Sequence, residues 1–102
     1  MELRLDLDRS TGVPVVAVRG DIDVCTAAKL DQRLQEVAGG GHREVQIDLS
    51  EVEYMDSEGL KVLIRLRNSL GEDGNVTVRG ARGAVLRILQ ISGLPRILRI
   101  SD

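Results

Sequence analysis

The chain has 102 residues, 42% of them hydrophobic and 29% charged, with a net charge of −2. These proportions are ordinary for a globular protein, and the length allows one domain with one hydrophobic core. There is no Trp or Phe, and Tyr54 is the single tyrosine, so the chain lacks the aromatic side chains on which nucleic-acid bases stack. Lys and Arg are interspersed with Asp and Glu, which argues against direct nucleic-acid binding.

The chain has one cysteine, Cys25. A single cysteine excludes an intrachain disulfide and a zinc cluster built from several thiolates, and we expect Cys25 to be a small, buried or half-buried filler. The first four residues lack the apolar run of a signal peptide, and no apolar run reaches transmembrane length. We therefore expect a cytoplasmic protein that makes no membrane contact.

The first two predicted strands are short and adjacent. Leu3, Leu5 and Leu7 alternate with charged residues, which is typical of a strand with one exposed face. A turn at residues 10–12 leads into a second strand from Val13 to Val18. Strands joined this tightly are expected to pair antiparallel.

Amphipathic helices follow. Apolar residues recur at helical spacing between Ala27 and Val37, and glycines 39–41 mark the end of this helix. Asp23 or Thr26 could cap its start. A second helix is predicted over residues 56–70, and its apolar stripe consists of Leu60, Leu63, Leu66 and Leu70.

Alternating apolar residues predict strands over 45–49 and 76–78, on either side of the second helix. A third helix carries Val85, Ile88 and Leu89 and ends near Gly93, and residues 97–100 form the last strand. The order β-β-α-β-α-β-α-β predicts the α/β class. We expect one domain over 1–102, with a mostly parallel central sheet of four to five strands, an antiparallel N-terminal strand and three to four helices.

A catalytic role is not predicted. The sequence has no glycine-rich phosphate loop, no dinucleotide fingerprint and no nucleophile elbow. His42 is the only histidine, so no metal cluster is predicted. A Ser–His pair would have to use this one residue. A pair of catalytic carboxylates stays open because acidic residues are many, yet no spacing places two of them together. We therefore expect a protein that is not an enzyme, with no cofactor and no metal.

The segment from Asp48 to Leu60 stands out because it leaves a strand and enters a helix. Asp56 and Ser57 are both helix-capping residue types, so Ser57 could serve as a cap alone. A helix N-terminus also presents free amides and the positive end of the helix dipole. A phosphate on Ser57 would be tolerated there and would add a charge of roughly −1.5 to −2.

This segment resembles the signature of STAS domains (sulphate transporter and anti-sigma factor antagonist), and the likeness is greatest to the stand-alone bacterial anti-sigma factor antagonists. The signature is carried by the run Asp48-Leu49-Ser50, then Tyr54-Met55-Asp56-Ser57, then Gly59-Leu60. The turn at 20–23 and the tail at 85–98 resemble the family in the same order. The resemblance covers essentially the whole chain and implies a STAS-like fold.

The resemblance implies a regulatory cycle. The unphosphorylated protein binds an anti-sigma factor with serine kinase activity and thereby frees a sigma factor. Phosphorylation of Ser57 blocks that binding, and a serine phosphatase resets the cycle. Partner-binding residues carried over by position are Asp23, Thr26, Asp56, Ser57, Glu58, Gly59, Leu60 and Lys61.

Specific roles follow by position from the same resemblance. Asp56 caps the helix and orients the Ser57 hydroxyl, and Asp23 lies on the neighbouring loop. Gly59 lets the kinase backbone come close, because it has no side chain. Glu58 and Lys61 depart from the family, in which many members have Ser or Thr and a small residue at these places, and this leaves the choice of kinase open.

Two other functions remain in view. One is an accessory STAS subunit of a transporter or lipid-trafficking complex, in which Ser57 is only a cap. The other is a sensor domain for a nucleotide or small molecule, which the absence of a phosphate loop disfavours. We expect a monomer or a weak dimer.

Overall fold

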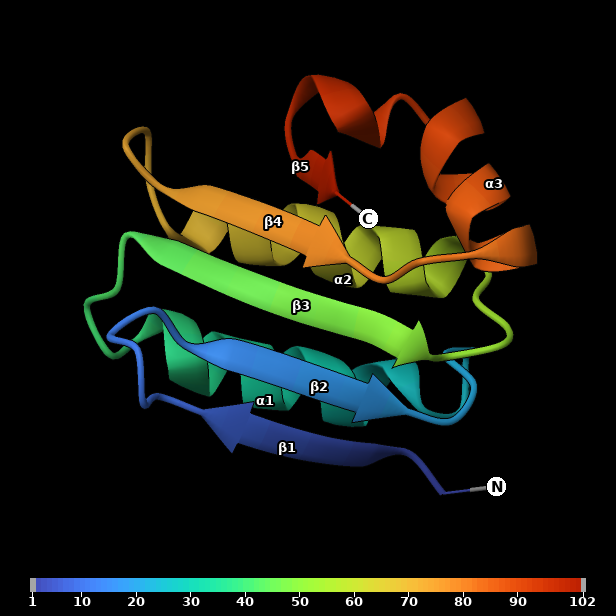
Figure 1. The fold of residues 1–102 in the computed structure, drawn as a ribbon, viewed down its shortest axis with the longest axis horizontal. Helices are drawn as coiled ribbons and strands as arrows, with labels where there is room; N and C mark the ends of the chain where they lie inside the picture. The colour runs from blue at the N-terminus through green and yellow to red at the C-terminus, as the bar shows by residue number, and fades with distance from the viewer. Residues whose placement is uncertain (1, 102) are drawn as a thin grey trace.

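The computed structural model describes residues 2–101. Its central sheet has five strands in the order β1-β2-β3-β4-β5, and Figure 1 shows them side by side. β1 (Arg4–Asp8) pairs antiparallel with β2 (Val15–Arg19), and all later neighbours pair parallel. The remaining strands are β3 (Glu44–Glu51), β4 (Asn75–Arg79) and β5 (Arg99–Ser101).

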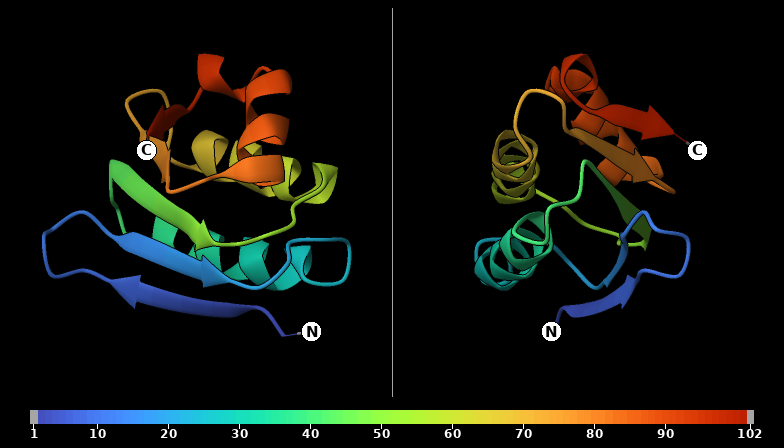
Figure 2. Two further views of the ribbon diagram at one scale, coloured as in Figure 1. Left: turned by 45° about the vertical axis from the view of Figure 1, so that its right-hand side comes forward. Right: turned by 90° about the vertical axis from the view of Figure 1, so that its left-hand side faces the viewer.

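Each parallel connection runs through a helix. These helices are α1 (Ala27–Ala38), α2 (Ser57–Ser69) and α3 (Gly83–Ile91), and the short 3-10 helix η1 (Leu94–Arg96) follows α3. Right-handed crossovers between strands that lie in chain order place their helices on one face of the sheet. Figures 1 and 2 show α1 and α2 side by side on that face. The predicted α/β class, element order and mixed sheet are confirmed.

The core lies between the sheet and these helices. Val45, Ile47 and Leu49 alternate along β3 and are fully buried on the helix side. Leu34 of α1 and Leu66 of α2 are equally buried against them. The apolar residues at every second position of the strand and those at helical spacing therefore pack into one apolar layer.

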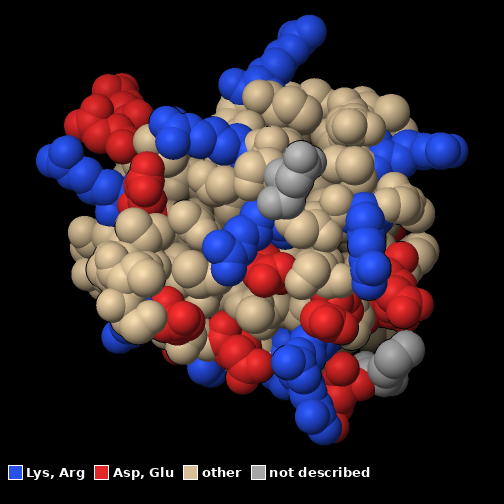
Figure 3. All heavy atoms as spheres, in the orientation of Figure 1, with Lys and Arg blue, Asp and Glu red and all other residues tan. Residues whose placement is uncertain are grey.

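The opposite face of the sheet is polar. Figure 3 views this face and shows acidic and basic side chains interspersed over it. Arg79 lies 3.8 Å from Asp48 on the neighbouring strand, and Arg99 lies 3.8 Å from Glu44. On this face the charges thus pair across strands instead of forming a field of one sign.

Two local predictions were wrong in detail. The stripe of α2 is centred on Val62 and Leu66, and Leu60 and Leu70 are only partly buried, because the prediction weighed leucines alone. The last strand starts at Arg99 instead of Ile97. Gly93, with φ of +83°, and Pro95 direct the chain into η1 first, since the glycine ends α3 and the proline favours the first turn of a new helix.

Cys25 is exposed, so the prediction of a buried or half-buried filler was wrong. It lies in the turn that precedes α1, where Asp23 and Thr26 hold the backbone. Buried positions of the following helix begin at Ala27. A small apolar residue type could not by itself indicate that the chain still lies outside the core at this point.

Candidate functional site

Two loops meet at one edge of the sheet. Because β2 and β3 are parallel, their carboxyl ends lie at the same edge, and the loops that follow them start side by side. The amide of Ile22 donates to the carbonyl of Tyr54 at 2.9 Å, and the amide of Asp56 donates to the carbonyl of Ile22 at 3.2 Å. An isolated parallel bridge between Ile22 and Met55 results. The starts of α1 and α2 are therefore held together by backbone hydrogen bonds.

Asp56 caps α2, as the sequence predicts. Its backbone is extended, with φ of −111° and ψ of −167°, and its Oδ1 accepts a hydrogen bond of 2.9 Å from the amide of Glu58. Its carbonyl accepts from the amide of Gly59 at 3.1 Å. This single residue thus engages two amides of the first helical turn, which would otherwise need other partners.

Ser57 is the first residue of α2 and is exposed. Since Asp56 holds the cap position, the simple reading of Ser57 as the cap is wrong. Its hydroxyl lies at the end of the helix where the dipole favours negative charge. Because Ser57 is exposed, its hydroxyl is accessible to another molecule.

Asp23 and Thr26 build the neighbouring turn. Oδ1 of Asp23 accepts from the amides of Cys25 and Thr26 at 2.9 and 3.1 Å. The Thr26 hydroxyl donates to the carbonyl of Asp21 at 2.7 Å and accepts from the amide of Asp23 at 3.0 Å. Thr26 occupies the cap position of α1, but its side chain makes no capping bond. Both residues therefore shape the loop beside Ser57.

The structure explains the glycine at position 59 differently from the sequence, which suggests that it gives a partner's backbone access. It is buried, and a Cβ at this position would lie 2.4 Å from Cγ of Met55 and 3.0 Å from Cγ2 of Ile22. The missing side chain therefore lets α2 pack against the bridge that joins the two loops. Gly59 faces the interior, so it does not open the surface to a partner's backbone.

A charged row continues along α2. Nζ of Lys61 lies 3.0 Å from Oε2 of Glu58, and Nη1 of Arg65 lies 2.8 Å from Oδ2 of Asp31 on α1. The two pairs border a groove of about 220 Å³ between α1 and α2. The residues lining this groove are Val24, Ala27, Ala28, Asp31, Glu58, Lys61, Val62 and Arg65.

Two exposed apolar side chains lie in the loops that lead into α1 and α2, and sequence analysis did not select either of them. The relative exposure of Val24 is 73% and that of Tyr54 is 49%. Exposed apolar side chains contribute to interaction surfaces where they form a contiguous patch. The signal was present in the sequence, since the only aromatic residue of the chain lies three positions before Ser57.

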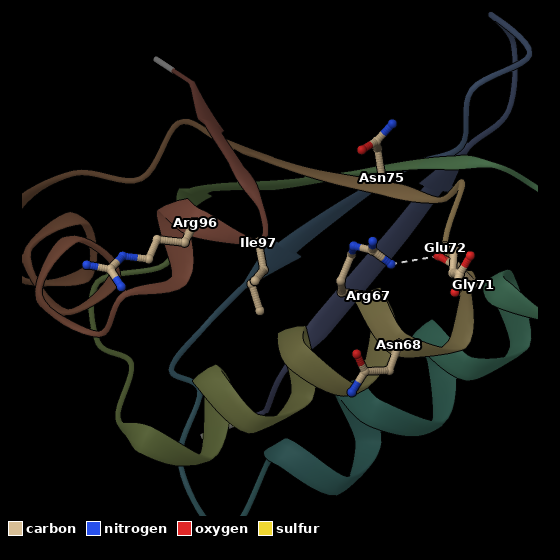
Figure 4. Close-up of a pocket in the computed structure, with 7 residues that line it drawn as sticks. All are labelled: Arg67, Asn68, Gly71, Glu72, Asn75, Arg96 and Ile97. Atoms are coloured by element: carbon tan, nitrogen blue, oxygen red, sulfur yellow. Dashed lines mark hydrogen bonds between the residues drawn. The ribbon is translucent and has the colours of Figure 1, made fainter.

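A larger cavity, of about 580 Å³, lies at the other end of α2. Figure 4 shows Arg67 reaching toward Gly71, whose carbonyl accepts a 2.7 Å hydrogen bond from Nη1, while Arg96 extends away from Arg67. The two basic side chains of this cavity therefore do not converge on one point. It contains none of the sequence-predicted site residues.

The described residues 2–101 contain no cluster of three or more His, Cys, Asp or Glu side chains that could hold a metal. Within that same span, no helix is both long and apolar enough to cross a membrane. The carboxyls with a lowered pKa lie elsewhere. The pKa of Asp8 is lowered mainly by hydrogen bonds from Ser10. Burial raises the pKa of Asp48, but hydrogen bonds from Ser50 and the charge of Arg79 together lower it. At the loop edge, the hydroxyl group at the start of α2 is that of the exposed Ser57.

The structure is an α/β domain with α1 and α2 on one face of the sheet and an exposed serine at the start of α2. The model of the family described as "Mlab, STAS domain" matches residues 5–99. The chain therefore belongs to the STAS domain family, which confirms the resemblance noted in the sequence.

Named relatives support this placement. The chain is 37% identical over 90 residues to the anti-sigma-F factor antagonist RsfB of Mycobacterium tuberculosis, an alignment that covers 87% of this chain and 73% of the relative. It is 26% identical over 103 residues to the anti-sigma-B factor antagonist of Staphylococcus aureus, with coverage of 100% and 95%.

Solved structures agree with the fold. A crystal structure of an anti-sigma factor antagonist from Mycobacterium paratuberculosis superposes with a TM-score of 0.92 at 32% identity, covering 99% of this chain and 86% of that one. The Bacillus protein SpoIIAA in its phosphorylated form gives a TM-score of 0.74 at 16% identity, with coverage of 97% and 92%. At that identity the likeness concerns the fold alone.

Proposed function

We propose that this protein is an anti-sigma factor antagonist, and that phosphorylation of Ser57 switches off its binding to an anti-sigma factor. The names of the relatives support the first half of this proposal. One observation carries the second half: Ser57 is exposed at the first residue of α2, while Asp56 makes the capping bond. The hydroxyl can thus be modified without loss of the cap.

The docking surface is the edge where the two loops meet. Val24 and Tyr54 supply exposed apolar area in the two loops, and Asp23 and Thr26 hold the loop that carries Val24. Interface energy is concentrated in a few buried anchors, and aromatic residues are enriched among them. Tyr54 is therefore the anchor that we expect to matter most.

Phosphorylation changes this surface by charge. A kinase transfers the γ-phosphoryl group of ATP to Oγ of Ser57, ADP leaves, and the hydroxyl proton passes to a base of the kinase. The product carries roughly −1.5 to −2 charges where the partner must approach. Desolvating that charge without a matching cation opposes docking. The kinase is the anti-sigma factor itself, and a serine phosphatase removes the phosphate, all in the cytoplasm where sigma factors act.

A binding panel tests the gating. Ser57→Ala should bind the anti-sigma factor as tightly as the wild type, and Ser57→Asp should bind at least about tenfold more weakly, which corresponds to roughly 1.4 kcal/mol. Thr11→Asp is the matched control, because Thr11 lies in the β1–β2 turn at the opposite end of the sheet. Equal affinities for all variants would exclude control through Ser57.

Mass analysis tests the modification. After incubation with ATP and a kinase-type anti-sigma factor from the same cell, intact mass should increase by one phosphate, and peptide mapping should assign it to Ser57. If no such kinase adds a phosphate, the accessory-subunit function becomes the better account, with Ser57 serving as a surface residue beside the cap.

A further inference from the structure

Lys61 is bonded to a neighbour of Ser57 and lies within one helical turn of Ser57 itself. Its Nζ is 3.0 Å from Oε2 of Glu58, a pair three residues apart. Lys61 also lies four residues after Ser57 on the same helix. Its ammonium group can therefore reach the Glu58 carboxylate and, after modification, a phosphate on Ser57. The side chain of Lys61 is 61% exposed and that of Glu58 35% exposed. The ammonium group is therefore free to change partners.

Before modification, the charges around Ser57 are already engaged. The carboxylate of Asp56 accepts the capping bond, and that of Asp23 accepts two amides of its own turn. On the helix face toward α1, Asp31 is paired with Arg65. Glu58 has Lys61 as its ion-pair partner. Two ion pairs leave Asp23 and Asp56 without a cation, so the named groups keep a net negative charge around Ser57.

We propose that Lys61 exchanges partners when Ser57 is phosphorylated, leaving Glu58 and binding the phosphate. The inference rests on the proposed function only in taking Ser57 as the modified residue. A phosphoserine carries nearly twice the charge of a carboxylate and three acceptor oxygens. An anion placed four residues N-terminal to a cation is also the favourable orientation along a helix. Because Glu58 is also N-terminal to Lys61, the orientation suits both anions, and the greater charge of the phosphate favours it over Glu58.

The exchange alters more of the surface than the phosphate alone. Glu58 and Lys61 both line the groove between α1 and α2, together with the exposed Val24. When Lys61 turns toward Ser57, the Glu58 carboxylate remains at the groove without its counterion. The phosphorylated protein then differs from the unmodified one at two points, at Ser57 and in the groove beside it. Lys61 is accordingly a positioning residue through which phosphorylation of Ser57 also alters the groove between α1 and α2.

The test does not need a kinase, so its outcome is independent of whether a kinase acts on Ser57. The full chain is prepared by semisynthesis with phosphoserine at position 57, and its phosphorus resonance is titrated against pH. The second pKa of a phosphoserine is ordinarily about 6. In Lys61→Gln that pKa should be higher than in the wild type by about 0.3, and Lys61→Arg should keep the wild-type value.

Arg43→Gln is the matched control, since Arg43 is exposed and precedes β3 at the far end of the strand from Ser57. It removes one positive charge without touching the helix. A direct contact predicts a shift for Lys61→Gln and almost none for Arg43→Gln. Equal shifts in the two variants, or an unchanged pKa in both, would overturn the exchange of partners, and would leave the gating by Ser57 to be judged by its own binding test.

Discussion

Asp56 and Ser57 are both residue types that cap helices, but the backbone gives them different tasks. The extended backbone of Asp56 turns its carboxylate toward the amide of Glu58. Ser57 is already helical, so its hydroxyl is left at the surface. The sequence could predict that one of the two caps the helix and that the other is accessible, because both types compete for the same amides.

Substitution of Asp56 tests this division. Asp56→Ala should lower the free energy of unfolding by about 1 kcal/mol, because an amide of the first turn loses its acceptor. Asp56→Asn should retain most of the stability, since the amide oxygen can still accept. Urea denaturation measures both. A loss of the same size in both variants would show that the hydrogen bond at the cap is not what Asp56 contributes.

Gly59 illustrates what the sequence could not tell. The family pattern shows a glycine, but its reason depends on Met55, just before α2, and on Ile22, which reaches the position from the loop after β2. Only the parallel bridge between those two residues brings them against α2. A contact between segments this far apart in the chain leaves no local signal.

Gly59→Ala should therefore destabilise the fold by about 1–3 kcal/mol, because the added methyl group overlaps Met55. Helix propensity alone predicts the reverse, a gain of about 1 kcal/mol. Thermal or urea unfolding distinguishes the two, and the double variant Gly59→Ala/Met55→Ala should lose less stability than the two single variants added together. A stable Gly59→Ala protein that fails to bind its partner would restore the role of partner access.

At the scale of elements, the alternation of strands and helices was predictable because their periods differ. Val45, Ile47 and Leu49 show a period of two, and the helices show apolar positions three or four residues apart. The start of the last strand was not predictable, because Gly93 and Pro95 permit both a direct strand and a short 3-10 helix. Local residue preferences are weak where tertiary packing decides.

The polar face of the sheet makes stability depend on pH. Burial raises the pKa of Asp48, but hydrogen bonds from Ser50 and the charge of Arg79 together outweigh it and hold the pKa below the ordinary 3.8. A carboxyl with a lowered pKa in the folded state stabilises the fold above its unfolded pKa, and this contribution is lost as pH falls. The loss should therefore occur below pH 3.8.

Asp48→Asn should flatten the decrease of the free energy of unfolding below that pH, because the proton-linked contribution is removed. Asp6→Asn on β1 is the matched control, since it removes an exposed carboxyl that has no bond from Ser50. Urea titrations at a series of acidic pH values provide the measurement. If the free energy of unfolding fell equally with pH in Asp48→Asn and in the wild type, Asp48 would not be a source of the pH dependence.

At the scale of the whole molecule, the fold and the switch are largely independent. The core lies between sheet and helices, whereas Ser57, Val24 and Tyr54 lie exposed at the loop edge. The sequence could place Ser57 and Asp23 at this edge through the family pattern. It did not single out Val24 or Tyr54, because exposure of an apolar side chain is a property of the assembled surface.

This separation makes a prediction about stability. Ser57→Asp should leave the free energy of unfolding unchanged or raise it by up to about 1 kcal/mol, because a negative charge at a helix N-terminus is favourable. The same variant should lose affinity for the partner. Circular dichroism with urea denaturation gives the stability. A strongly destabilised Ser57→Asp protein would mean that lost binding reflects unfolding instead of a changed surface.

The most direct test compares the affinity of the anti-sigma factor for the unmodified protein and for the same protein quantitatively phosphorylated at Ser57. Titration calorimetry at physiological salt should show tight binding for the first and at least about a hundredfold weaker binding for the second, a difference of roughly 2.7 kcal/mol. Equal affinities for the two forms would contradict the account and leave Ser57 without a regulatory role.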